Sequence, residues 1–465
     1  EYTTAVGDDA NDGLSPATPK ASLRALLEAY DFDAGDTIYV DTGVYNITTN
    51  IELTADDAGV EIRGPVEDDH TALFDRGNTN SGNYVFRLND ADGVMLSHLD
   101  VTGAQIGIYA SQQDSDDVVL DSLDIYGNAW EGIYLDPTND NTRLVDLLVH
   151  NNSRDGVELV GTGVEISGGR YYANSGQGIY LRGADASVTD VQADANASWG
   201  IYLTAVRGLI EGSHVFDNSS GLYASGSGTV VRGTEAHNNR TVGISIAGGA
   251  LAENNLAFGH NGSNDIGIQV SNSTARDNIA YGNNRGIQGS GVIESNRVYA
   301  NTWGIVATGN ADKVRDNAAY SNTTGIQVSA GQSWYTASVN NNRVYDNSDY
   351  GIVINNGDDH AVYNNTILQP TGTALRVQGS ADRTQLYDNI VEFGDGYAIT
   401  VSDDSQVGLG SDYNLFHKTG SGALGQWEGV DFADQVSWFA ALGLDQHSRE
   451  GDPLLADPDL SLIHI

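Results

Sequence analysis

The feature that most constrains this chain is a four-residue pattern that recurs about every 22 residues. Each copy begins with Gly, continues with Ile, Val or Leu and a variable residue, and closes on an apolar or small residue. Each tetrad predicts a very short strand whose second and fourth side chains share one face. One such strand cannot bury that face alone, so successive repeats must stack. The tetrads start at Gly107, Gly132, Gly156, Gly178, Gly200, Gly221, Gly243, Gly267, Gly286, Gly304, Gly325 and Gly351.

A second strand-like element precedes each tetrad, for example ESNRVYAN before Gly304 and NNNRVYDN before Gly351. Apolar residues alternate with period two inside these elements, and Gly, Asn, Asp and Ser fill the corners. Helical repeats would need apolar spacings of three and four over longer stretches. The pattern therefore predicts an all-β right-handed parallel β-helix with two or three short strands per coil.

An Asn occupies the same corner in nearly every repeat. Asn tolerates left-handed backbone and can bond nearby main chain, so it suits a tight turn. Because stacked coils lie about 4.8 Å apart, these side chains can also form an amide ladder. The predicted ladder includes Asn174, Asn196, Asn218, Asn283, Asn301 and Asn322.

From about Gly93 to Val401 the repeats resemble the right-handed parallel β-helix superfamily, which includes extracellular pectate-lyase-like and alginate-epimerase-like proteins. The resemblance implies the fold, but this fold hosts many activities. We expect entry strands and a cap in residues 1–60, with an amphipathic helix from Ala21 to Tyr30 over the open end. The coils are expected in 61–408 and an irregular cover in 409–459. Residues 460–465, LSLIHI, resemble a translated sequencing tag and are expected to be an assembly scar of metagenomic origin.

The charge balance restricts the partners. The net charge is −41, from 63 acidic and 22 basic residues, so nucleic acid and anionic membranes are poor partners. No apolar run is long enough to cross a bilayer. Calcium is the one cofactor left open, because it could bridge the chain to an acidic glycan. Its candidate ligands, in a loop that departs from the usual spacing and for which a plain turn is favoured, are Asp8, Asp9, Asn11 and Asp12.

The variable third residue of each tetrad points outward. Five of the first six are Tyr, which would form an aromatic strip roughly 25 Å long. Phenol rings with a polar tip suit contact with glycans and with protein, and Tyr is also simply a good exposed strand residue. The residues of this predicted contact strip are Tyr109, Tyr134, Tyr180, Tyr202 and Tyr223.

Asp136 and Pro137 directly follow the GIYL tetrad at Gly132. They resemble the start of the D-P-H-E motif of alginate epimerases, whose first Asp is catalytic, but Thr138 and Asn139 replace the His and Glu. Arg182 has the same offset two coils later, roughly 10 Å away. Lyase or epimerase chemistry would use Asp136 as the base and Arg182 to stabilise the developing charge.

The regular repeats and the incomplete motif favour a structural or adhesive protein of the extracellular space or cell surface. It would be a surface protein or fibre subunit that contacts polysaccharides or other copies of itself. Two alternatives stay open: a polysaccharide lyase, epimerase or glycoside hydrolase, and a phage tailspike-like protein.

Overall fold

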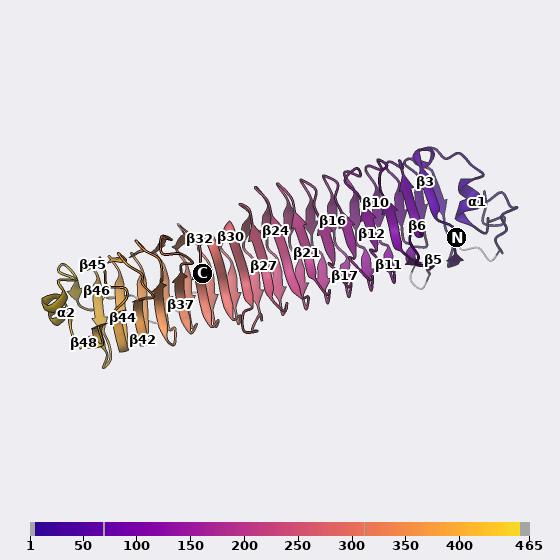
Figure 1. The fold of residues 1–465 in the computed structure, drawn as a ribbon. Coiled ribbons are helices and arrows are strands. Elements are labelled where there is room, and N and C mark those ends of the chain that lie inside the picture. The colour runs from indigo at the N-terminus through magenta and orange to yellow at the C-terminus, as the bar shows by residue number, and fades with distance from the viewer. Residues whose placement is uncertain (1–4, 68–69, 311, 456–465) are drawn as a thin grey trace. The chain divides into compact units, whose positions relative to one another are not determined.

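The computed structural model describes residues 5–67, 70–310 and 312–455. Short strands dominate it, with the α-helices α1 (Leu23–Leu27) and α2 (Gln435–Leu442) and the 3-10 turn η1 (Ala55–Asp57). The chain divides into two compact units, Glu1–Leu256 and Ala257–Ile465. In each unit, strands pair in parallel with strands one coil further along the chain, which confirms the predicted β-helix (Figure 1).

Three strand series build the coils of unit 1. The first series contains β10 (Val119–Asp121), β13 (Arg143–Val145), β16 (Glu165–Ser167), β19 (Ser187–Thr189) and β22 (Leu209–Glu211). The second contains β11 (Asp124–Tyr126), β14 (Leu148–His150), β17 (Arg170–Tyr172), β20 (Gln192–Asp194) and β23 (His214–Phe216). The tetrads form the third, with β9 (Ile106–Ala110), β12 (Ile133–Leu135), β15 (Val157–Leu159), β18 (Ile179–Leu181), β21 (Trp199–Thr204), β24 (Ser220–Ser225) and β27 (Val242–Ala247).

The tetrad sequence follows from this stacking. Its second and fourth side chains fill the core: Ile179 and Leu181 are both 0% exposed. A Cβ atom on Gly178 would lie 2.7 Å from the Gly200 carbonyl oxygen and 2.8 Å from the Asn196 amide nitrogen. Any side chain there would therefore force adjacent coils apart, which explains why Gly opens each tetrad.

The asparagine ladder is confirmed, with a different turn conformation from the one expected. The Asn174 main-chain N–H donates to Asn196 Oδ1 at 3.1 Å, and Asn196 donates in the same way to Asn218 at 2.9 Å. The left-handed residue is the one before the ladder Asn, for example Ala173 (φ 54°) and Ala195 (φ 54°). The ladder side chains are thus selected for hydrogen bonding, whereas the strain falls on their neighbours.

In unit 2, an amide ladder joins Asn283, Asn301 and Asn322. A second column, Asn278, Asn296, Asn317 and Asn342, continues through Asn365, Asn389 and Asn414. Several strands here run through a whole corner, including β30 (Ile266–Arg276), β42 (Thr366–Gln378) and β44 (Ile390–Val401).

The C-terminal part of unit 2 continues the coils before it becomes irregular. Beyond residue 408, where the sequence predicts a cover, β45 (Gly410–Asp412) and β46 (Leu415–Lys418) still pair in parallel with earlier strands. Helix α2 follows, and its Trp438 is 0% exposed and donates from Nε1 to Asp445 at 3.0 Å. The predicted scar, residues 460–465, lies outside the described residues.

The N-terminal helix is shorter than predicted. It spans Leu23–Leu27 instead of Ala21–Tyr30, and the Ser22 hydroxyl caps it by accepting from the Ala25 N–H at 3.2 Å. Its proposed role of covering the first coil stays a prediction. In the described part of the chain, no helix combines the length and apolar character needed to cross a membrane.

Candidate functional site

The predicted tyrosines form one column on the outward face of the third strand series in unit 1, here called the tyrosine column: Tyr109, Tyr134, Tyr180, Tyr202 and Tyr223. Tyr109 and Tyr134 stack with ring centroids 5.8 Å apart, and Tyr202 and Tyr223 stack at 4.7 Å. Trp199 adds an edge-on ring 5.7 Å from Tyr223. Side chains that are spread over 115 residues of sequence thus form a nearly continuous aromatic surface.

Glu158 interrupts this column. It lies in register between Tyr134 on β12 and Tyr180 on β18, so neither of these rings stacks on another tyrosine across the gap. Arg182 donates to Glu158 Oε1, and its guanidinium carbon lies 4.6 Å from the Tyr180 ring centroid. Tyr180 meets Tyr202 edge-on, with an interplanar angle of 86°. The interruption therefore leaves aromatic faces beside a carboxylate and a guanidinium group.

Two further carboxylates flank the interruption, and the sequence did not single them out as site residues. Glu131 and Asp155 immediately precede the tetrad glycines of adjacent coils, and Glu131 is 4% exposed. Burial raises the pKa of Asp155 to about 6, opposed by the hydrogen bond from the Gln177 N–H, while Glu158 and Glu131 raise it further. Burial also raises the pKa of Glu131. Both carboxyl groups thus bind protons more readily than exposed ones.

Arg154 connects this acidic group to a further aromatic ring. Its Nη1 lies 3.5 Å from Glu131 Oε1, and its guanidinium carbon lies 3.9 Å from the centroid of Trp130. Trp130 is 39% exposed. We call Glu131, Asp155 and Glu158, with Arg154 and Arg182, the acidic cluster. It combines three hydrogen-bond acceptors with aromatic surface, which is the chemistry of hydroxyl-group recognition.

Asp136 has a well-defined structural environment. It is 8% exposed and accepts from the Gln112 N–H at 2.7 Å, the Thr138 hydroxyl at 2.7 Å and the Asn139 amide at 2.9 Å. Burial raises its pKa, but these hydrogen bonds outweigh that effect and hold the pKa below its usual value. Because Arg182 is occupied by Glu158, the structure does not bring Asp136 and Arg182 into direct contact. The catalytic role of this pair stays a prediction.

A second, closely packed aromatic column lies in unit 2, on strands that include β36 (Ala318–Tyr320) and β39 (Arg343–Tyr345). Its rings stack in order, with Tyr320 and Tyr345 4.8 Å apart. Tyr320 is 8% and Tyr345 is 7% exposed, and Leu455 packs against them. This column is therefore partly used by the fold itself, whereas the tyrosine column is half-buried and open to solvent.

The N-terminal loop residues lie in turns. Asp9 accepts from the Ala21 and Ser22 N–H groups, Asp12 accepts from the Thr18 hydroxyl at 2.6 Å, Asp8 accepts from the Ala10 N–H, and Asn11 donates to the Pro19 carbonyl. Across the described residues, no group of three or more His, Asp and Glu side chains is placed to hold a metal ion. Calcium binding at this loop stays a prediction.

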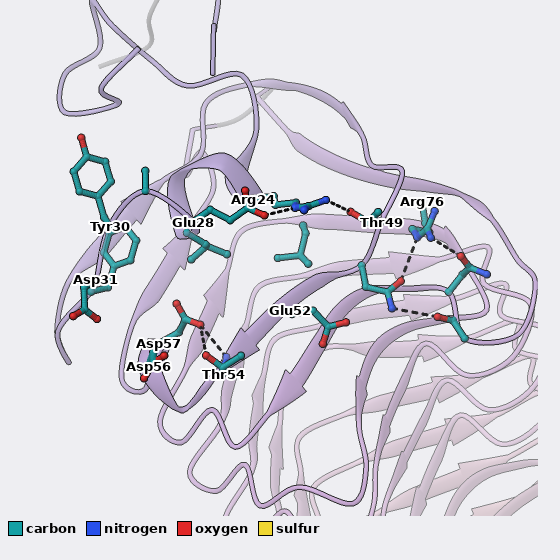
Figure 2. Close-up of a pocket in the computed structure, with 17 residues that line it drawn as sticks. Arg24, Glu28, Tyr30, Asp31, Thr49, Glu52, Thr54, Asp56, Asp57 and Arg76 are labelled. Carbon is teal, nitrogen blue, oxygen red and sulfur yellow. Dashed lines mark hydrogen bonds and ion pairs between the residues drawn. The ribbon is translucent and has the colours of Figure 1, made fainter. Parts of the chain in front are cut away.

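A cavity of about 860 Å³ lies beside α1 (Figure 2). Around it Arg24 bonds Glu28 at 2.7 Å and Thr49 at 3.1 Å, and Asp57 accepts from Thr54. Some of the polar side chains on its wall are therefore engaged with one another. The cavity lacks the in-register aromatic rings of the tyrosine column, so we place the candidate site on the column.

The comparisons with known proteins agree with this fold. A family model described as a right handed beta helix region matches residues 31–193, 131–284, 199–338 and 288–433. The chain belongs to the right-handed β-helix family. Among curated protein sequences, no match to this β-helix is found.

Several solved structures resemble this β-helix distantly. The periplasmic alginate epimerase AlgG is 10% identical with a TM-score of 0.28, over 89% of this chain and 84% of its own. The A-module of the Azotobacter vinelandii mannuronan C-5 epimerase AlgE4 is 15% identical with a TM-score of 0.31, over 97% and 100%. A tailspike protein of E. coli bacteriophage HK620 is 11% identical with a TM-score of 0.37, over 85% and 71%. At these values the likeness carries no argument about activity.

Proposed function

We propose that this β-helix binds an extended glycan along the tyrosine column of unit 1. The observation that supports this proposal is the interrupted column itself: half-buried Tyr rings in register, with carboxylates and guanidinium groups among them. Sugar rings present apolar C–H faces and hydroxyl edges, so they match aromatic faces bordered by polar acceptors. A repeating polymer also matches a surface that repeats once per coil.

The same proposal accounts for the acidic chain. A surface with net charge −41 repels other polyanions but presents many acceptors to neutral hydroxyl groups. We place the protein at the cell surface or outside the cell, where extended glycans are available, as an adhesive or structural component. Contact between copies through the same column is the alternative use of this surface.

The test is affinity electrophoresis of the full chain in native gels that contain a soluble polysaccharide. Replacing Tyr202 and Tyr223 by Ala should reduce the retardation about tenfold or more, because stacking contributes on the order of 1 kcal/mol per ring. Tyr39→Ala is the matched control, because Tyr39 is 75% exposed and lies outside the column. Equal retardation of both variants would refute the proposal.

A second candidate is glycoside hydrolysis at the acidic cluster, favoured by the pKa of about 6 at Asp155. A carboxyl group that is partly protonated near neutral pH can act as the general acid, with Glu158 as the second carboxyl group of the pair. New reducing ends that appear with the wild-type chain and disappear with Asp155→Asn would support hydrolysis. Binding without new reducing ends would leave the column as a binding surface only.

A further inference from the structure

We infer that the glycan bound at the tyrosine column is uncharged, a neutral polysaccharide rather than a polyuronate. This inference rests on the proposed function and specifies its ligand. The charges that lie against the column decide the ligand, because an anionic sugar needs a cation that is available to it.

Three arginines that lie against the column, Arg87, Arg154 and Arg182, are already paired with carboxylates. Arg182 bonds Glu158, Arg154 lies 3.5 Å from Glu131, and Arg87 lies 3.6 Å from Glu52. Glu158 and Glu131 have side chains only 14% and 5% exposed, so removing their partners would leave buried charges unpaired. A uronate carboxylate would have to break these pairs to gain a cation.

Lysine does not change this balance. The chain has three lysines, of which Lys313 and Lys418 belong to unit 2. Lys20 lies in the N-terminal loop, where its ammonium group donates to the carbonyl oxygens of Asp9 and Asn11. The column therefore carries paired guanidinium groups and an excess of acid.

Acidic residues outnumber basic ones at the column itself as well as in the whole chain. Glu52, Glu131, Asp136, Asp155 and Glu158 lie on or beside the column, against Arg87, Arg154 and Arg182. Among the described residues Asp155 forms no ion pair with an arginine, and Arg154, which lowers its pKa, is engaged by Glu131 and by the Trp130 ring. A polyuronate would bring one further negative charge per sugar to a surface that is already negative.

The same carboxylates suit neutral sugars. An ionised carboxylate accepts two or more hydrogen bonds and donates none, so it pairs with neighbouring hydroxyl groups of a sugar ring. Tyr134 and Tyr180 offer rings on either side of Glu158, two coils and therefore roughly 10 Å apart along the stacking direction. The carboxylates that repel a uronate can thus accept hydrogen bonds from two neighbouring hydroxyl groups of a neutral sugar.

The experiment compares native gels containing laminarin, xylan, alginate or polygalacturonate, with EDTA and separately with calcium. The wild-type chain should be retarded by at least one neutral polymer, with a loss of fivefold or more in Tyr202→Ala. It should migrate freely in both polyuronates under both conditions. The variant Glu158→Gln, which releases Arg182 from its partner, should gain retardation in polygalacturonate of about threefold or more.

The outcomes separate the two proposals. Retardation by a polyuronate that is lost in Tyr202→Ala would overturn the neutral ligand, and it would leave glycan binding intact. If that retardation required calcium, a bridging cation would replace the missing basic group and the inference would again be wrong. Free migration in all four polymers would refute both the proposed glycan binding and the assignment of a neutral ligand.

Discussion

Replacing Asn196 by Ala tests the amide ladder, which the structure makes the main polar support of the coils. The Asn196 side chain is 2% exposed and takes part in four hydrogen bonds. Its Oδ1 accepts from the Asn174 main-chain N–H and side-chain amide, both at 3.1 Å, while its Nδ2 donates to the Tyr171 carbonyl at 2.9 Å and to Asn218 Oδ1 at 3.0 Å.

The expected cost follows from these partners. The Asn174 side-chain amide keeps its bond to a strand carbonyl, but the Asn174 main-chain N–H loses its acceptor inside the core. A buried orphaned donor costs about 1–3 kcal/mol, and each further lost bond costs about 1 kcal/mol. We therefore expect Asn196→Ala to lower the free energy of unfolding of unit 1 by about 4–6 kcal/mol.

Urea unfolding followed by far-ultraviolet circular dichroism measures this change, with Asn80→Ala as the matched control. Asn80 is exposed, so its removal should change stability by less than about 0.5 kcal/mol. A loss below about 1 kcal/mol for Asn196→Ala would show that solvent or neighbouring groups replace the ladder, and the account of the corner would be wrong.

Three further predictions use the same measurement. Gly178→Ala should destabilise unit 1 by at least about 2 kcal/mol, because its Cβ would lie 2.7 Å from the Gly200 carbonyl; an unchanged midpoint would mean that the coils can separate freely. Ala173→Gly should stabilise it by about 1 kcal/mol, because Ala173 has φ 54°; a loss of stability would contradict the strain assigned to this residue. The raised pKa of Asp155, about 6 against 3.8, means that its favourable contribution is full below pH 4 and is lost as the pH rises to 6. Asp155→Asn should therefore gain about 1–2 kcal/mol at pH 7 relative to wild type and remove that slope, whereas an equal slope in both proteins would refute the assignment.

The sequence predicts the coils well because their determinants are local and periodic. Gly178, Ile179 and Leu181 specify a strand, its inward face and its close approach to the next coil within four residues. The register that aligns Tyr134, Glu158 and Tyr180 follows from counting tetrads. The sequence alone thus predicts both the parallel stacking and the tyrosine column.

The acidic cluster could not be read in the same way. Glu131 and Asp155 sit before the tetrad glycine, at a bend where strict alternation no longer tells which way a side chain points. Their shared offset from Gly132 and Gly156 is the signal that could have found them. Asp136 is the opposite case. A two-residue resemblance to a known motif made it a candidate catalytic residue, but its carboxylate accepts hydrogen bonds from Thr138 and Asn139.

The sequence also did not predict that the coils of unit 2 continue past residue 408, because the Gly-Ile tetrads end before that residue. Asn389 and Asn414 continue the second ladder, and this Asn column is the signal in the sequence that extends past the tetrads. In the long strands β42 and β44, Ala374 and Ala398 take the position at which Gly opens the earlier tetrads, so the signal on which the repeat assignment depends is lost.

The most direct test of the central claim is a crystal structure of the full chain soaked with a neutral oligosaccharide that retards it in gels. The account predicts sugar density along β12, β15, β18 and β21, with one ring beside Glu158 between Tyr134 and Tyr180. Density confined to another surface, with the tyrosine column empty, would contradict it.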